Sequence, residues 1–246
     1  MTDRIRLGIG LPAFGLHLDI GHAAMWLGLG AALASVQDKF DLRWMSEYHI
    51  NGVDLARNTI VYDAMKAECD WVFMIDADTF HRSGGDAGGA IADAGVDILQ
   101  MIRDADRGAV APGDTPSRIL SPLHKHNGIA LIGAPVRGRG GKSEPCVIAI
   151  GDSSKIIPLE DLRGKVRSVG RIGAACIAVN LKWLREHWPV GPWFKMEHDF
   201  SGRPAHALSE DYYFCDEARK RGGAIVCDGR FVPEHVDRRR LVGQAP

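Results

Sequence analysis

The sequence has almost no net charge and no paired cysteine motif, and both absences restrict the possible functions. The formal charge is −1 over 246 residues, which argues against a protein that holds nucleic acid through a global positive field. Any contact with a polyanion must therefore be local. The five cysteines are odd in number and include no C-x-x-C pair. We therefore expect reduced, structural thiols and no disulfide framework.

A targeting signal and a membrane span are also lacking. Asp3, Arg4 and Arg6 precede only a short apolar stretch, which is not typical of a signal peptide. The apolar segment 20–36 is short and interrupted by glycine, so it favours a helix that faces the core. We expect a cytoplasmic protein, or one of the host cytoplasm if a phage encodes it. The oligomeric state is not indicated.

The common phosphate-binding motifs are absent as well. Gly8-Ile9-Gly10 follows the first predicted strand, but the third position of the dinucleotide fingerprint is Ala13, and Pro12 has no N–H to offer a pyrophosphate. No G-x-x-x-x-G-K-[ST] sequence occurs. If the protein binds a nucleotide, a metal ion must therefore neutralise much of the phosphate charge.

What is present is an alternation of apolar strands and amphipathic helices. With 46% hydrophobic and 25% charged residues, the chain can form one large domain, 1–246, with a flexible basic tail at 237–246. This order predicts an α/β, Rossmann-like fold with a mostly parallel central sheet flanked by helices and a small antiparallel portion. The predicted strands are 4–10, 41–47, 71–75, 97–101, 129–134, 174–179 and 224–227, with antiparallel segments at 146–150 and 166–172. The predicted helices are 23–36, 55–69, 88–94, 182–187 and 210–221, and 103–125 is predicted to be a long loop.

Asp76-Ala77-Asp78 is the most informative motif. It follows the uncharged run 71–75, which is typical of a buried central strand. Ligands of open α/β sheets bind at the carboxyl ends of such strands. Alternate residues of an extended segment point the same way, so both carboxylates can address one divalent cation and its phosphates. A strand end followed by capping aspartates is the structural alternative.

A second acidic pair, Glu210-Asp211, begins the predicted helix 210–221. Ser209 is placed to cap this helix, and both carboxylates would lie near its positive end. A simple capping turn explains the same pattern without function.

Four elements, taken in order, carry a family resemblance. They are 8–12 at the end of the first strand, 56–58 on a helix, 76–78, and 209–214 followed by His235. Together they resemble GT-A-type glycosyltransferases, and are similar to small bacterial and phage members of glycosyltransferase family 2.

The resemblance runs from about residue 4 to residue 236. It implies a nucleotide-sugar donor, with a UDP-sugar favoured, a divalent Mn²⁺ or Mg²⁺, and sugar transfer to an acceptor hydroxyl. The acceptor class stays open between a glycan, a small molecule and, if a phage encodes the chain, a modified DNA base that would have to leave its stack.

The resemblance also implies roles for individual residues. Asp78 coordinates the metal, Asp76 contacts the ribose or reaches the metal through water, and His235 completes the metal site, where its nitrogen would favour Mn²⁺ over Mg²⁺. Asp211 is the general base of an inverting transfer. Glu210 would orient the acceptor or a helix-end amide.

The resemblance also implies further contacts with the nucleotide-sugar donor, carried by less specific sequence patterns. Pro12 and Ala13 would border the nucleotide base through backbone groups. Arg57 and Asn58 lie on a helix from which Arg57 can reach a phosphate or the Asp76 carboxylate, and a purely structural salt bridge is the alternative.

Small and basic segments complete the predicted site. Gly173 would leave room for the donor sugar or acceptor, although tight sheet packing explains a small residue equally well. Lys142, in the Arg/Gly segment 137–142, would bind a diphosphate or an acidic acceptor, and a solvated loop is the alternative. The basic cluster 238–240 would close over the diphosphate or follow a nucleic-acid backbone. The aromatic residues of 188–194 would form either an acceptor wall or part of the core.

Two other functions remain open. A nucleotidyltransferase of similar architecture would also use paired carboxylates and a metal, but the first strand is not followed by a Gly-rich loop carrying Arg or Lys. A nonenzymatic protein that binds nucleic acid or sugar would retain the fold and use the basic segments.

Overall fold

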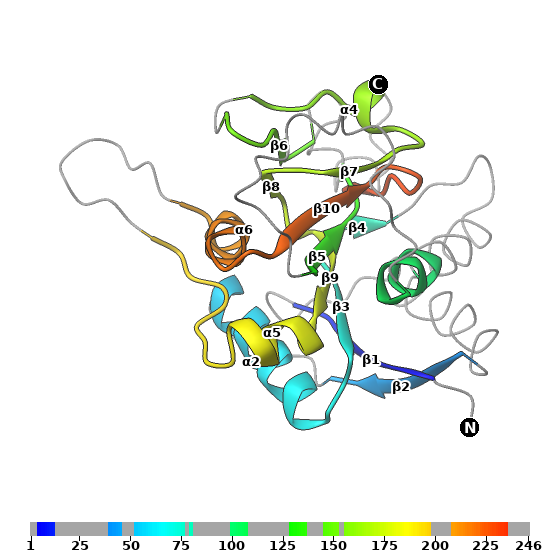
Figure 1. Cartoon of the computed structure of the whole chain (residues 1–246), viewed down its shortest axis with the longest axis vertical. Helices are drawn as coiled ribbons and strands as arrows, with labels where there is room; N and C mark the ends of the chain where they lie inside the picture. Colours follow the sequence, from blue (N-terminus) through cyan, green and yellow to red (C-terminus); the bar gives the residue numbers. More distant parts are fainter. Residues whose placement is uncertain are drawn as a thin grey trace, which may run out of the picture.

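The computed structural model describes residues 4–12, 39–45, 52–76, 79–80, 99–107, 128–136, 145–152, 155–197 and 208–235. These residues form an α/β, Rossmann-like fold around one seven-stranded sheet (Figure 1). The strand order is β2-β1-β3-β9-β5-β10-β7. Their bounds are β1 Ile5–Gly10, β2 Phe40–Trp44, β3 Trp71–Ile75, β5 Ile129–Gly133, β7 Val166–Ser168, β9 Cys176–Asn180 and β10 Ala224–Asp228.

The sheet is mixed, with most strands in one direction. Parallel pairing joins β1 to β2 and β3, and β10 to β5. Strand β9 lies between β3 and β5 and is antiparallel to both, and β7 is antiparallel to β10. A small antiparallel pair, β6 (Val147–Ile148) with β8 (Arg171–Ile172), lies beside it, as the sequence predicted for this region.

Helices cover both faces of the sheet. The helices α2 (Val53–Lys66), α5 (Leu181–His187) and α6 (Glu210–Lys220) cover one face, and the helical residues 99–106 cover the other (Figure 1). A short helix, α4 (Leu159–Leu162), precedes β7.

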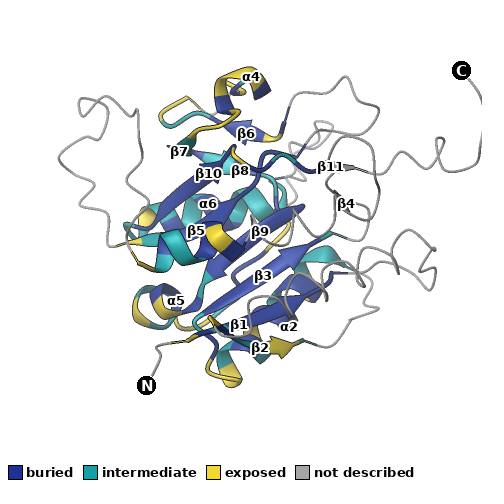
Figure 2. Cartoon of the chain, turned by 90° about the vertical axis from the view of Figure 1, so that its right-hand side faces the viewer, coloured by how far each residue is buried: buried dark blue, intermediate teal, exposed yellow. Residues whose placement is uncertain are grey.

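Strand β3 shows why a central strand reads as an uninterrupted apolar run. All five of its residues are buried (Figure 2). Trp71 and Phe73 belong to the core under residues 99–106, whereas Val72 and Met74 belong to the core under α2, α5 and α6. Because successive side chains of a strand point to opposite faces, one strand contributes to both cores.

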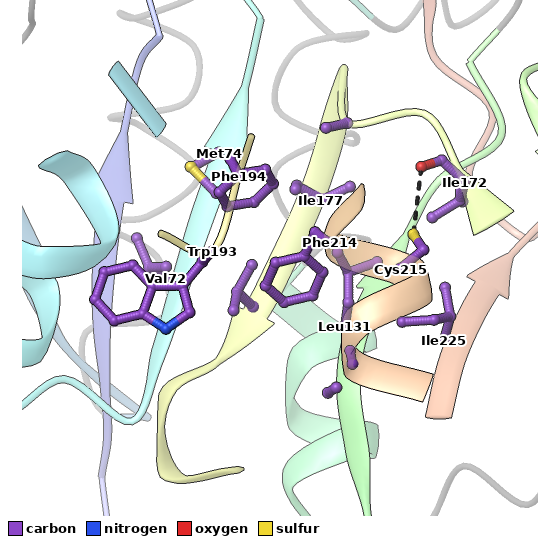
Figure 3. Close-up of a cluster of buried hydrophobic side chains, with 14 of the residues drawn as sticks. Val72, Met74, Leu131, Ile172, Ile177, Trp193, Phe194, Phe214, Cys215 and Ile225 are labelled. Carbon is purple, nitrogen blue, oxygen red and sulfur yellow. Dashed lines mark hydrogen bonds between the residues drawn. The ribbon is translucent and has the colours of Figure 1, made fainter. Parts of the chain in front are cut away.

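The core under α6 is rich in aromatic residues (Figure 3). Phe194 stacks on Phe214 of α6 with ring centroids 4.9 Å apart. Trp188 and Trp193 are buried in the same cluster. The aromatic residues of 188–194 are therefore core residues, and the alternative of an acceptor wall is not supported.

One predicted strand is wrong. Residues 99–101 were expected in a strand, but 99–106 are helical, and Leu99, Ile102 and Ala105 recur at helical spacing and are buried together. Strand β9 is the antiparallel member in the middle of a sheet that was predicted to be mostly parallel. The apolar run 174–179 indicates a buried strand but no direction for it.

Some predictions lie outside the described residues. These are the helices at 23–36 and 88–94, most of the loop at 103–125 and the basic tail. Among the residues that are described, no helix is long and apolar enough to cross a membrane.

The glycines of β1 let α2 approach the sheet closely. A Cβ added at Gly10 would collide with Cγ2 of Ile60, and one at Gly8 would lie 3.2 Å from Cβ of Ala64. Both contacts are with α2. These glycines therefore serve helix–sheet packing, which agrees with the rejection of a dinucleotide fingerprint.

We predict that Gly10→Ala destabilises the protein by about 1–3 kcal/mol, because the added methyl group overpacks the contact with Ile60. Urea unfolding of Gly10→Ala, Ile60→Ala and the double variant measures how far the effects of the two substitutions on the free energy of unfolding depend on each other. The cost of Gly10→Ala should fall when Ile60 is already truncated. An equal cost in both backgrounds would show that the close approach is not the cause.

Candidate functional site

The carboxyl ends of β3 and β5 meet the beginning of β9 at one edge of the sheet. The backbone N–H of Asp76 donates to the Ala175 carbonyl at 2.9 Å, and the N–H of Ala134 donates to the Cys176 carbonyl at 3.0 Å. Because β9 runs against its neighbours, its first residues rather than its last lie at this edge. Asp76 and the segment 174–176 are thereby held side by side.

A cavity of about 350 Å³ opens at this edge. Its charged walls are Arg57, Asp76, Glu210 and Asp211, which come from α2, the end of β3 and the first turn of α6. The remaining walls are small or apolar, including Cys146, Gly173 and several aliphatic side chains. The two acidic motifs singled out in the sequence therefore contribute to the same cavity.

Arg57 connects these charges. Its side chain is almost completely buried, with 2% of the residue exposed. Nη2 donates to Oδ1 of Asp76 at 2.7 Å and to the Ala174 carbonyl at 3.3 Å, and Nη1 donates to Oε1 of Glu210. Nε has no hydrogen-bond partner in the described structure. Arg57 thus reaches the Asp76 carboxylate, one of the two contacts expected for it, and forms a further salt bridge with Glu210.

The buried charges shift each other's pKa. Burial opposes the charged form of Arg57, but the carboxylates of Asp76, Glu210 and Asp211 outweigh it and raise the pKa of Arg57. Burial also raises the pKa of Glu210, and Asp211 and Asp76 add to this rise while Arg57 opposes it. Three carboxylates face one guanidinium, so the fully ionised cluster carries an excess of negative charge.

Asp211 is held by three hydrogen bonds. Its Oδ2 accepts from the N–H of Ala174 at 3.1 Å, and its Oδ1 accepts from the N–H of Tyr212 at 2.7 Å and from the Ser209 hydroxyl. Ser209 occupies the N-cap position of α6 but makes no side-chain cap. The predicted capping bond is therefore replaced by one that orients Asp211.

Gly173 lies beside this carboxylate. A Cβ at Gly173 would be 3.0 Å from Cβ of Cys146 and 3.7 Å from Oδ2 of Asp211. The first distance is tight and the second is an ordinary contact, so an added side chain would mainly press on Cys146.

Two short strands lie next in sequence to two of the predicted metal ligands. Strand β4 (Thr79–Phe80) pairs with β11 (Glu234–His235), with His235 opposite Thr79. Residue 235 is therefore next to the residue that follows Asp78. Asp78 itself and the side chain of His235 lie outside the description. Within the described residues, no three His, Cys, Asp or Glu side chains form a group that could hold a metal.

Asn58 and Pro12 are placed away from the cavity walls. The Asn58 amide nitrogen donates to the carbonyls of Asp54 and Phe194, and its oxygen accepts from the N–H groups of Trp193 and Phe194. Asn58 thus holds the 193–194 backbone and does not line the cavity. Pro12 is buried just after β1.

Ala13 and Lys142, also predicted to contact the donor, lie outside the described residues.

All five cysteines are free thiols, as predicted. Burial raises the pKa of the thiols, including those of Cys176, Cys215 and Cys227. Cys146 differs because it is exposed and lines the cavity. Cys146 was not recognised as part of the site from sequence. The segment 173–175 was singled out for its small residues, but the bond from the Ala174 N–H to Asp211 was not foreseen, because it depends on the turn between β8 and β9.

No protein-family model matches the sequence, and no curated protein matches it. Among solved structures, A197 from STIV is similar, with a TM-score of 0.50 at 12% identity over 94% of this chain and 86% of that chain. A glycosyltransferase involved in the glycosylation of the major capsid of PBCV-1 has a TM-score of 0.37 at 10% identity, over 95% of this chain and 92% of that chain.

HddC from Yersinia pseudotuberculosis, complexed with GMP-PN, has a TM-score of 0.37 at 13% identity, over 87% of this chain and 99% of that chain. The likeness to A197 shows a shared fold and no more. The two alignments at 0.37 are too weak to support an argument about function.

We predict that Glu210 makes stability depend on pH. Its pKa in the folded state is raised above the ordinary value of 4.5, so the unfolded chain loses this proton first as the pH rises. The stabilisation by Glu210 relative to Glu210→Gln should therefore be greatest below the ordinary value and decline as the pH rises through the folded pKa.

Urea unfolding of both proteins between about pH 4 and 7 measures this difference. Glu186→Gln, a substitution of the same type at an exposed side chain, is the control. A difference that grows with pH would contradict the raised pKa of Glu210.

Proposed function

We propose that this protein is a metal-dependent glycosyltransferase with a GT-A-like fold, which moves a sugar from a nucleotide-sugar donor to an acceptor hydroxyl. The observation that carries the proposal is the convergence of Asp76, Glu210 and Asp211 on one cavity, where Arg57 is the one cation among the described lining residues. A buried excess of negative charge favours a bound cation. The cavity lies where ligands of α/β sheets bind, at the strand carboxyl ends.

The donor set suits a hard divalent ion. We propose that Asp78 and His235 hold the metal and that Asp76 contributes directly or through water; the pairing of β4 with β11 supports this because it aligns His235 with Thr79. When bound, Mn²⁺ or Mg²⁺ would neutralise the leaving diphosphate. A UDP-sugar is the proposed donor. Ala13 and Lys142 are proposed to contact it, and Pro12, which does not line the cavity, would border the nucleotide base through its backbone only.

Asp211 is the proposed general base. An ionised carboxylate has roughly four acceptor positions, and the bonds to Ala174, Ser209 and Tyr212 use three of them. The carboxylate is therefore oriented and retains capacity to accept the proton of an acceptor hydroxyl. Attack by that hydroxyl on the anomeric carbon would expel the nucleoside diphosphate and invert the configuration.

We predict that Asp211→Asn lowers kcat by about 10²–10⁴-fold and leaves donor affinity unchanged, because the amide cannot take the proton. Steady-state kinetics with calorimetric donor binding measure both quantities. Asp161→Asn, in the exposed first turn of α4, is the matched control for replacing an aspartate near a helix start. Transfer at the wild-type rate by Asp211→Asn would refute this role.

We predict that Asp78→Asn removes metal-dependent donor binding. Titration of a panel of UDP-, GDP-, ADP- and dTDP-sugars, with Mn²⁺ and after chelation, should give binding of one donor only when the metal is present. Asp78→Asn should then behave as the chelated wild type does.

The same titrations separate the competing functions. Metal-dependent binding of a nucleoside triphosphate together with a sugar phosphate, without turnover of nucleotide-sugars, would instead indicate a nucleotidyltransferase. Sugar or nucleic-acid binding that persists without metal would indicate a nonenzymatic binding protein.

A further inference from the structure

Within the described part of the chain, Arg57 is the one cation that contacts both Asp76 and Glu210. Its two terminal nitrogens are bound to carboxylates on different elements, Asp76 after β3 and Glu210 at the start of α6. Both partners are largely buried, with side-chain exposures of 23% and 9%. A donor phosphate would have to compete with these carboxylates for the guanidinium.

We propose that Arg57 is a positioning residue, which locks the metal-side carboxylate Asp76 and the catalytic carboxylate Asp211 into one arrangement, and that it is not a phosphate ligand. This inference rests on the transferase function proposed above. It replaces the sequence-based expectation of a donor contact at Arg57 with a role that acts through other residues.

Two routes connect Arg57 to Asp211. In the first, Nη2 of Arg57 binds the Ala174 carbonyl at 3.3 Å, and the N–H of Ala174 binds Oδ2 of Asp211 at 3.1 Å. In the second, the ion pair with Glu210 fixes the residue that precedes Asp211 in the first turn of α6. Both routes end at the same carboxylate, so the orientation of Asp211 depends on the guanidinium.

The geometry requires arginine rather than any cation. The guanidinium is a planar fork whose nitrogens can bind two acceptors at fixed directions, whereas a lysine offers one compact ammonium group. One nitrogen cannot occupy the positions of both Nη1 and Nη2. Arg57→Lys should therefore keep the charge and lose the bridge between Asp76 and Glu210.

Kinetics distinguish positioning from phosphate binding. For Arg57→Lys and Arg57→Gln we expect kcat to fall by about 10²-fold, the loss typical of small misplacements of catalytic groups, with donor Kd nearly unchanged. A phosphate ligand would instead weaken donor binding and retain kcat at saturating donor. Full kcat in Arg57→Lys would also overturn the proposal, because charge alone would then suffice.

A second measurement tests whether Arg57 fixes these residues in the ligand-free protein. It does not depend on an assay of enzymatic activity. We expect amide hydrogen exchange at Ala174 and Asp76 to become faster in Arg57→Gln, because the Ala174 carbonyl and the Asp76 carboxylate lose their shared donor. The control is Arg171→Gln. This substitution breaks the bidentate ion pair between Arg171 on β8 and Asp216, which lies on α6 as Glu210 does.

The two measurements separate the possible failures. Unchanged exchange in Arg57→Gln, or equal acceleration in the control, would overturn the positioning role whatever the protein catalyses. A third outcome is amide exchange that is faster in Arg57→Gln but not in the control, in a protein that transfers no sugar from any donor. That result would support the positioning role of Arg57 and reject the transferase function.

Discussion

A guanidinium buried between two carboxylates constrains the whole active edge of the sheet. Arg57 can reach Asp76 and Glu210 together only if α2, the end of β3 and the start of α6 keep fixed relative positions. Removing three charges from water is costly, and such pairs are poor evidence for stability on their own. Their contribution here is specificity, because only a fixed arrangement of these elements lets one guanidinium bind both carboxylates.

The close packing of α2 on β1 makes this arrangement possible. Gly8 and Gly10 allow the helix to lie against the strand, which brings the side chain of Arg57 to the strand ends. The next residue, Asn58, ties the other flank of the helix to the backbone of 193–194. One helix thus links the glycines of the first strand, the charged cavity and the aromatic core through adjacent positions.

The sequence predicted individual strands and helices better than the direction of the strands or the contacts between distant residues. The apolar run that forms β3 and the helix that starts at Glu210 were recognisable because burial and helix-start chemistry leave local patterns. The direction of β9 was not, because an apolar run indicates burial but not the direction of the strand. The pairing of Arg57 with Glu210 joins residues 153 positions apart, and the backbone contact of Ala174 carries no side-chain signal at all.

The pairing of β4 with β11 also has a consequence for the order in which the molecule is assembled. Thr79 and His235 are far apart in the chain, yet they are direct partners. On a ribosome, β1, β2 and β3 can pair while translation continues, but β4 must wait for nearly all of the remaining described chain. The pairing of β4 is therefore completed late, after the described residues of the cavity wall have been synthesised.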